Sequence, residues 1–122
     1  MTPGIILFAH GSRIEAANES VRTAAAALAR AGSFPHVEAA FLELGQPDLA
    51  GAAARLADRG VGSILVVPYF LTLGTHMERD LPALVREISK AHNNLEISVT
   101  PPLDGHPALV QVLLDRVRAA LG

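Results

Sequence analysis

The sequence contains no cysteine. This absence excludes disulfide bonds, thiolate nucleophiles and metal sites with cysteine ligands, and it fits a reducing cytoplasm, where we expect the protein to work. A secretion signal is not expected, because no basic residue precedes the apolar residues 5–9 and that run is too short for a signal core. No stretch approaches the ~18 apolar residues of a membrane-spanning helix, so we expect no membrane partner.

Aromatic residues and clustered positive charge are also scarce. Aromatics make up 4% of the chain, while half of the residues are hydrophobic, many of them alanine. This balance favours helices packed closely on a sheet over an aromatic-rich binding surface. The 10 Lys and Arg residues and 12 Asp and Glu residues give a net charge of −2. Because no group of basic residues reaches the density of a nucleic-acid-binding surface, we expect no nucleic-acid partner.

The chain of 122 residues is predicted to form one domain over residues 1–122. A chain of this length buries roughly two-thirds of its unfolded surface, which is enough for a core. Runs typical of buried strands alternate along it with segments of helical periodicity. We predict strands at about 4–9, 36–42, 63–67 and 96–99, and helices at about 13–30, 46–59, 78–91 and 107–121.

Four strand–helix units in strict alternation predict an α/β fold. The expected architecture is a three-layer, doubly wound, parallel four-stranded sheet with right-handed crossovers and helices on both faces. We expect the strand order 2-1-3-4, which places the topological switch between the first and third strands. In open sheets of this kind, ligands bind outside the carboxyl ends of the strands at the switch.

Particular residues set the expected helix boundaries. Gly32 is expected to end the first helix, and Pro47 to lie in the first turn of the second. Glu78 and Asp80 are expected to give the third helix an acidic first turn, which would match the helix dipole. The last helix has an apolar stripe that we expect to face inward: Leu109, Val110, Leu113, Leu114, Val117 and Leu121.

Two histidines follow the strands on either side of the expected switch point. His10 follows the first strand, and His76 lies on the predicted loop after the third; Glu43 follows the second strand. Two imidazoles and one carboxylate form a mixed nitrogen and oxygen set that suits iron, cobalt, nickel or zinc. Three protein ligands leave coordination positions open for chemistry on the metal or for its transfer. The sequence therefore predicts His10, His76 and Glu43 as catalytic and metal-binding residues.

Each of these residues also has a structural interpretation. His10 alone can be a strand-end histidine bonded to nearby backbone, while His76 and Glu43 can be solvated surface groups. The arrival of both histidines at one edge of the sheet favours a functional role. His36 opens the second strand at the opposite edge and is expected to be structural, and His92 fits a helix C-terminal cation.

The segment between the third strand and His76 is unusually apolar for a surface connection. Core packing explains part of this, and a flat apolar ligand lying on the strand ends would explain the rest. The predicted ligand-binding residues are Phe70, Leu71, Thr72 and Thr75 in this segment, with Ser12 and Arg13 after the first strand. Arg79 and Arg13 are candidates for binding carboxylates, with solvated surface as the equal alternative. His106 is a candidate for the pocket wall, although Asp104–Pro107 also fits a helix start.

Three segments of the chain resemble the class II tetrapyrrole chelatases. They are Ala-His-Gly-Ser-Arg at 9–13, Phe-Leu-Glu at 41–43 followed by Pro47, and Val-Pro-Tyr-Phe-Leu at 67–71 followed by Gly74, His76, Asp80 and Pro82. The fixed spacing of the third segment is the specific part. Within that family the sequence is most similar to the small single-domain sirohydrochlorin cobaltochelatase and ferrochelatase group. The resemblance runs nearly end to end and includes residues 105–107 and 115–116.

The resemblance implies ATP-independent insertion of Co²⁺ or Fe²⁺, with Ni²⁺ as a further possibility, into the tetrapyrrole sirohydrochlorin for cobalamin or sirohaem synthesis. It implies that His10 and His76 bind the metal or take pyrrole protons, and that Glu43 matches an acidic residue of the same site. The metal is then a substrate, and no permanently bound cofactor is implied. Long family members carry two such domains in tandem, so the resemblance implies a homodimer for this chain.

Two other functions stay open from the residues alone. A non-catalytic metal or tetrapyrrole carrier would have the same pocket and would leave the rate of metal insertion unchanged. A phosphoryl-transfer enzyme with His10 as nucleophile is disfavoured, because histidine phosphatases resemble Arg-His-Gly at this point and residue 9 here is alanine. The same ligands serve cobalt, iron and nickel, so the metal and the histidine that takes the protons also stay open.

Overall fold

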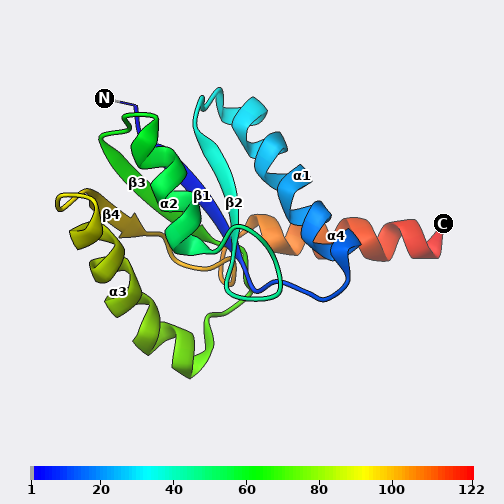
Figure 1. Ribbon diagram of the computed structural model, residues 1–122. Helices are drawn as coiled ribbons and strands as arrows, with labels where there is room; N and C mark the ends of the chain where they lie inside the picture. Colours follow the sequence, from blue (N-terminus) through cyan, green and yellow to red (C-terminus); the bar gives the residue numbers. More distant parts are fainter. Residues whose placement is uncertain (1) are drawn as a thin grey trace.

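The computed structural model describes residues 2–122, and its helices and strands alternate as predicted (Figure 1). The elements are β1 (Gly4–Ala9), α1 (Glu15–Gly32), β2 (Val37–Phe41), α2 (Leu49–Asp58), β3 (Ser63–Pro68), α3 (Gly74–Ala91), β4 (Glu96–Val99) and α4 (Ala108–Leu121). Within these described residues, no helix is both long enough and apolar enough to cross a membrane.

The four strands form one parallel sheet in the order β2-β1-β3-β4, which confirms the predicted fold class and topology. Ile5 of β1 lies opposite Val37 of β2 on one side and Leu65 of β3 on the other. Every residue of β1 is buried, as its unbroken apolar run predicts for a central parallel strand. The carboxyl ends of β1, β2 and β3 therefore lie together at one edge of the sheet.

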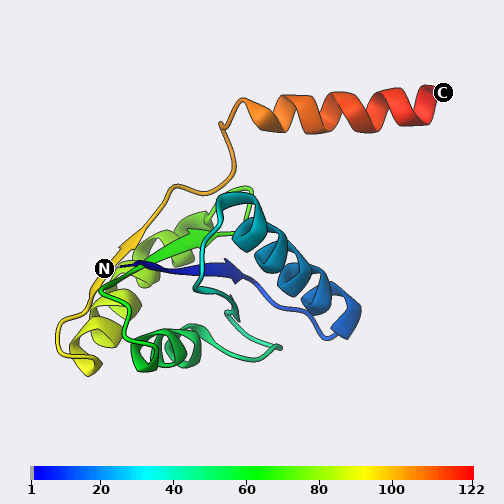
Figure 2. The same ribbon diagram turned by 90° about the horizontal axis from the view of Figure 1, so that it is seen from above.

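Side chains of β1 alternate between two hydrophobic clusters, one on each face of the sheet. Ile6 and Phe8 pack in the larger cluster, which contains the apolar faces of α2 and α3. Leu7 and Ala9 pack in the smaller cluster with the buried face of α1. Two helices thus cover one face and α1 covers part of the other, which gives the predicted three layers (Figure 2).

Two of the predicted helix boundaries are wrong by one or two residues. Gly32 is the last residue of α1, and Ser33 takes the left-handed conformation (φ 55°) that ends the helix by donating its N–H to carbonyls of the last turn. Pro47 lies before α2. Asp48 caps that helix, because its side chain accepts the N–H of Gly51 at 2.8 Å. The sequence pattern predicts that a helix ends near these residues, but it does not show which of several neighbouring residues is the cap.

Helix α3 begins at Gly74, a full turn earlier than predicted. His76 therefore lies in its first turn and not on a loop, and the first turn holds no acidic residue, so the predicted role of Glu78 and Asp80 there is wrong. The reason is packing: Met77 contacts the larger core cluster one turn before Leu81, and so extends the apolar stripe of the helix backwards.

The prediction for α4 is wrong in a more important way. The helix forms over the expected residues, but it extends away from the sheet and none of its side chains is buried (Figure 2). Val110 is 68% exposed and Leu121 is 81% exposed. The face of the sheet that α1 covers is left partly open beside it, where Leu65 and Val67 of β3 are only half-buried. The apolar stripe of α4 is real, but this chain does not cover it.

The cap of α2 yields a prediction about stability. Asp48→Ala should lower the free energy of unfolding by about 0.5–2 kcal/mol, because the N–H of Gly51 loses its side-chain acceptor. Urea denaturation measures this change. Asp58→Ala is the matched control, because Asp58 is the last residue of the same helix, where a negative charge is unfavourable. An equal loss in both variants would contradict the capping role.

Candidate functional site

A pocket of about 330 Å³ lies at the carboxyl edge of the sheet. Its wall is formed by His10 after β1, Leu42 after β2, Phe70 after β3, and the continuous segment 72–77, which runs into the first turn of α3. The prediction that His10 and His76 share one opening is therefore confirmed. Apolar side chains form much of the wall, as is usual for sites that bind small molecules.

Backbone hydrogen bonds continue from β1 to β2 beyond the ends of both strands. Leu42 donates its N–H to the carbonyl of Ala9 at 2.9 Å, and Glu43 donates to the carbonyl of His10 at 3.1 Å. This pairing places Nδ1 of His10 3.9 Å from Oε1 of Glu43. Both side chains are more than half exposed, so solvent screens their attraction and both remain accessible to a ligand.

Gly11 allows the two loops to approach this closely. Its φ of +95° is a conformation that other residues rarely adopt, and a Cβ atom there would lie 1.7 Å from the carbonyl oxygen of Glu43. No side chain fits in that space. The glycine that follows His10 is therefore required for the contact between the His10 and Glu43 loops.

His76 is held from its own helix. Nδ1 of its imidazole lies 3.2 Å from Nη2 of Arg79, one turn further along α3. A guanidinium group can only donate, so in this contact Nδ1 of His76 is the acceptor. Arg79 also donates to Asp80 at 3.2 Å.

Phe70 connects the pocket to the core. Its ring meets that of His10 edge-on with centroids 6.3 Å apart, and meets that of buried Phe8 in the same manner at 6.0 Å. Edge-to-face contacts of this kind favour one orientation of each ring. The imidazole of His10 thus has an aromatic neighbour on one side and the carboxylate of Glu43 near its Nδ1.

The three predicted metal ligands do not form a closed cluster. Over residues 2–122, no three His, Asp or Glu side chains come close enough together to hold a metal ion. Glu43 lies beside His10, while His76 lines the same pocket from α3. His10 and Glu43 thus form an exposed pair of predicted metal ligands, and His76, the third predicted ligand, lies apart from them on the same pocket.

Comparison with known proteins identifies the family. The CbiX family profile matches residues 4–120. The chain belongs to the CbiX family. A sirohydrochlorin cobaltochelatase from Sulfolobus acidocaldarius is 35% identical over 118 residues, which cover 97% of this chain and 92% of that protein.

Two solved structures share the fold. The crystal structure of a putative cobalamin biosynthesis CbiX protein from Marinobacter aquaeolei has a TM-score of 0.86 and 30% identity, covering 98% of this chain and 97% of the other. The sirohydrochlorin chelatase SirB from Bacillus subtilis, in complex with cobalt, has a TM-score of 0.85 and 26% identity. That match covers 98% of this chain but 51% of SirB, so this chain spans about half of its length.

The predicted ligand-binding residues fall into two groups in this CbiX chain. Phe70, Thr72 and Thr75 line the pocket. Among the described residues, the pocket wall does not include Ser12, Arg13, Leu71 or His106. The Ser12 hydroxyl accepts the N–H of Ile14, and Nδ1 of His106 accepts the N–H of Ala108 at the start of α4. Both side chains thus have local structural roles, while Arg13 and Leu71 are exposed.

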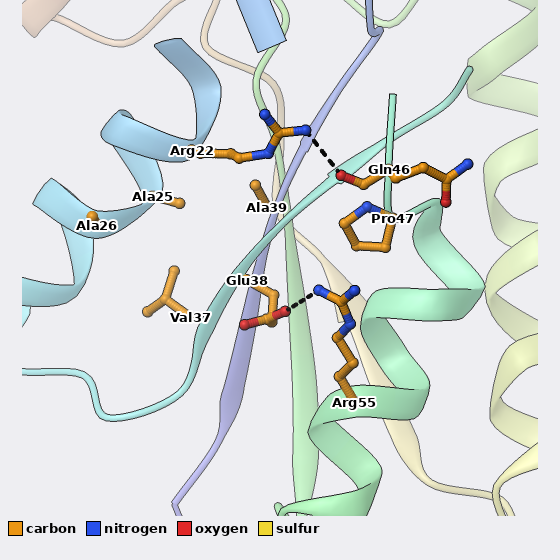
Figure 3. A pocket seen from close by; sticks show the side chains of 9 residues that line it. All are labelled: Arg22, Ala25, Ala26, Val37, Glu38, Ala39, Gln46, Pro47 and Arg55. Atoms are coloured by element: carbon orange, nitrogen blue, oxygen red, sulfur yellow. Dashed lines mark hydrogen bonds and ion pairs between the residues drawn. The ribbon is translucent and has the colours of Figure 1, made fainter. Parts of the chain in front are cut away.

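A second pocket of about 290 Å³ lies at the open edge of β2, between α1 and α2 (Figure 3). Its arginines are already paired: Arg55 binds Glu38 at 3.3 Å, and Arg22 donates to the carbonyl of Gln46 at 3.1 Å. Hydrogen bonds between Arg22 and Glu15 raise the pKa of the arginine and lower that of the carboxyl. No histidine lines this pocket, so it lacks the imidazoles of the predicted metal-ligand set.

The sequence reasoning missed Asn18, whose buried side chain bonds to the loops that carry His10 and Glu43. A signal was present, because Asn18 precedes Val21 and Ala25 at helical spacing on the buried face of α1. A polar residue on such a face requires hydrogen-bond partners. Leu42 and Met77 of the pocket wall were also missed. Whether they reach the pocket depends on where β2 ends and where α3 begins, which the sequence pattern does not fix to the residue.

The packing of Gly11 gives a second prediction. Gly11→Ala should lower the free energy of unfolding by about 2–5 kcal/mol, combining the left-handed conformation with the displacement of the Glu43 carbonyl. Gly60→Ala is the control, because Gly60 has a φ of +80° but open space at its Cβ position. It should cost only about 1–2 kcal/mol. Equal midpoints for the two variants in urea denaturation would show that the close approach of Gly11 to the Glu43 carbonyl does not add to the loss of stability.

Proposed function

We propose that this chain is a sirohydrochlorin chelatase that inserts Co²⁺ or Fe²⁺ without ATP, in the cytoplasm. The observation that carries the proposal is that His10 and His76 line one open, largely apolar pocket at the carboxyl edge of the sheet. The relative from Sulfolobus acidocaldarius is named a sirohydrochlorin cobaltochelatase, and the related SirB structure contains cobalt. These names support the same substrate and metals for this chain.

Metal insertion requires two pyrrole protons to leave as the cation enters the ring. Imidazole titrates near pH ~6.5, so at neutral pH it can accept a proton or bind a metal ion. The carboxylate of Glu43, 3.9 Å from Nδ1 of His10, places an oxygen donor and a negative charge where a divalent cation could bind beside the imidazole. His10 and Glu43 are therefore proposed to receive the cation, with His76 as the second histidine that binds metal or accepts protons.

The open donor set supports transfer of the metal over storage. A closed shell of four protein ligands is typical of structural metal sites, whereas reactive sites keep positions free. No three such ligands come together in the described part of the chain. The cation is thus proposed as a substrate that passes through the pocket and not as a resident cofactor.

The tetrapyrrole is proposed to lie against Phe70 and Leu42, with its carboxylates near the start of α3. Residues 74–77 of that helix line the pocket, and no side chain caps this end. The N–H groups of a first helical turn lack intrahelical partners and attract anions. The pocket volume of about 330 Å³ is at the low end of the ~300–1,000 Å³ range for small-molecule sites, so a macrocycle would extend beyond it.

Substitution of the histidines tests the proposed activity. His10→Ala and His76→Ala should each slow metal insertion roughly 10²-fold or more, because each removes a proton acceptor or metal donor. The rate is measured from the absorbance change of sirohydrochlorin on addition of Co²⁺ or Fe²⁺. His36→Ala and His92→Ala serve as controls, since neither residue lines the pocket.

Wild-type rates in His76→Ala would remove His76 from the mechanism. A wild-type protein that binds sirohydrochlorin and Co²⁺ but leaves their rate of combination unchanged would be a carrier and not an enzyme.

We also propose that the chain works as a homodimer in which α4 packs on the second copy. The helix presents an uncovered apolar stripe that includes Leu113 and Val117, 65% and 53% exposed. Beside α1, Leu65 and Val67 leave an apolar part of the sheet incompletely covered. A C2 dimer satisfies both surfaces twice, because each copy supplies one helix and one sheet face. Since this chain spans about half of SirB, a second copy would supply a comparable length of protein.

The oligomeric state can be measured by light scattering after size-exclusion chromatography. The wild-type protein should elute as a dimer, and Val117→Asp should shift it to a monomer by placing a charge in the apolar interface. Ala119→Asp introduces the same charge on the opposite side of α4 and should leave the dimer intact. A monomeric wild type would contradict this proposal without affecting the assignment of the histidines.

A further inference from the structure

Asn18 is a buried polar side chain that the proposed reaction does not use. It lies near the start of α1, only 1% of it is exposed, and it shares the buried face of the helix with Val21 and Ala25. Burial of an amide that makes no hydrogen bonds is strongly unfavourable. Its position therefore requires that the bonds it makes compensate for burial.

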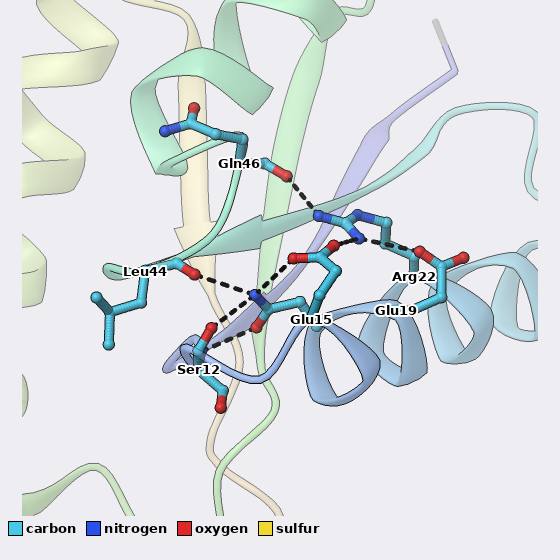
Figure 4. Close-up of polar contacts among 7 residues, drawn as sticks. Ser12, Glu15, Glu19, Arg22, Leu44 and Gln46 are labelled. Atoms are coloured by element: carbon cyan, nitrogen blue, oxygen red, sulfur yellow. Dashed lines mark hydrogen bonds and ion pairs between the residues drawn. The ribbon is translucent and has the colours of Figure 1, made fainter.

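The amide of Asn18 makes three short hydrogen bonds to the backbone of Ser12 and Leu44, whose positions are labelled in Figure 4. Its Oδ1 accepts the N–H of Ser12 at 2.9 Å, and its Nδ2 donates to the carbonyl oxygens of Ser12 at 2.8 Å and Leu44 at 3.0 Å. Glu15 lies further from Nδ2, at 3.4 Å. Because the N–H of Ser12 can only donate and the two carbonyls can only accept, these partners permit one orientation of the amide.

The bonded groups belong to the two loops that carry the proposed metal-binding pair. Ser12 lies two residues after His10, and Leu44 directly follows Glu43. Leu44 has a φ of 59°, a left-handed conformation that is unfavourable for leucine, and the hydrogen bond to its carbonyl helps to stabilise it. One buried side chain thus fixes both loops relative to α1 and to each other.

A second residue of α1 also holds the loop after β2, but further from the pair. Arg22 donates to the carbonyl of Gln46 at 3.1 Å and pairs with Glu15 and Glu19 on the protein surface. Its contact is partly exposed and does not reach the His10 loop. Asn18 is therefore the residue whose loss should change the separation of His10 and Glu43.

We propose that Asn18 is a positioning residue: its amide holds the carboxylate of Glu43 beside the imidazole of His10 and so raises the affinity of this pair for the incoming divalent cation. The inference rests on the proposed function for the identity of the cation. The inference concerns binding of the cation and not turnover, so the role of Asn18 and the proposed chelatase activity can be tested separately. Outer groups that orient metal ligands typically contribute about 10–100-fold to metal affinity.

The direct test is calorimetric titration with Co²⁺ alone. Asn18→Leu removes all three bonds at similar volume, and Asn18→Ser is a milder variant in case the first does not fold. Each folded variant should raise the Kd for Co²⁺ about 10-fold. Val21→Ala is the matched control, because it weakens packing on the same face of α1 without removing a bond to either loop. An unchanged Kd in folded Asn18→Ser would overturn the proposal.

A double-mutant cycle tests whether Asn18 acts through Glu43. In a Glu43→Gln background the carboxylate is already lost, so Asn18→Ser should have little further effect on the Kd for Co²⁺. Equal effects of Asn18→Ser in the wild-type and Glu43→Gln backgrounds would show that Asn18 acts independently of Glu43. That result would overturn the positioning role.

Steady-state kinetics separate positioning from general destabilisation. Asn18→Ser should raise the KM for Co²⁺ about 10-fold at unchanged kcat and leave the KM for sirohydrochlorin within about twofold, because Asn18 bonds to no part of the pocket wall at 70–77. A larger KM for sirohydrochlorin with an unchanged KM for Co²⁺ would overturn the proposal. A wild-type protein that binds Co²⁺ but inserts none would refute the proposed function and leave the binding comparison valid. A wild type that binds no Co²⁺ would refute both.

Discussion

The contact between the loops after β1 and β2 determines the geometry of the site. Two backbone hydrogen bonds extend the strand pairing past Ala9 and His10, and Gly11 packs its bare Cα against the carbonyl of Glu43. Parallel strands normally diverge where their hydrogen bonding ends, so these bonds keep two chemically active side chains at a fixed distance. β1 is central in the sheet and buried along its whole length, so this contact begins directly at the end of a buried strand.

The sheet order explains why the third donor comes from a different direction. β1 lies between β2 and β3, so the chain leaves β1 toward one face while the connection after β3 leads to α3 on the other. The pocket forms where these connections separate, as expected at a topological switch point. His10 and Glu43 therefore form a pair on one side, while His76 faces the same space from the first turn of α3.

Much of this arrangement follows from local patterns in the sequence. The alternation of strands and helices predicts a parallel sheet, and the unbroken apolar run of β1 marks it as a central strand. The expected order 2-1-3-4, which the structure shows, then brings His10 and His76 to one edge. The start of α3 could not be predicted without knowing that Met77 packs against the core. The bond between Asn18 and Leu44 could not be predicted either, because the two residues lie far apart in the sequence. The placement of α4 was not predictable from its stripe, because amphipathic spacing shows that a face needs cover and not which chain provides it.

The open arrangement of the proposed metal ligands has a physical explanation. A chelatase must bind its metal weakly enough to release it into a ring whose nitrogen donors then hold it more tightly, so a complete protein cage would oppose the reaction. The exposed carboxylate–imidazole pair that is proposed to receive the cation is not a closed cage, and His76, the proposed further donor or proton acceptor, lies apart from it. The pocket of about 330 Å³ is open in the same way, as suits a macrocycle that is proposed to extend beyond it.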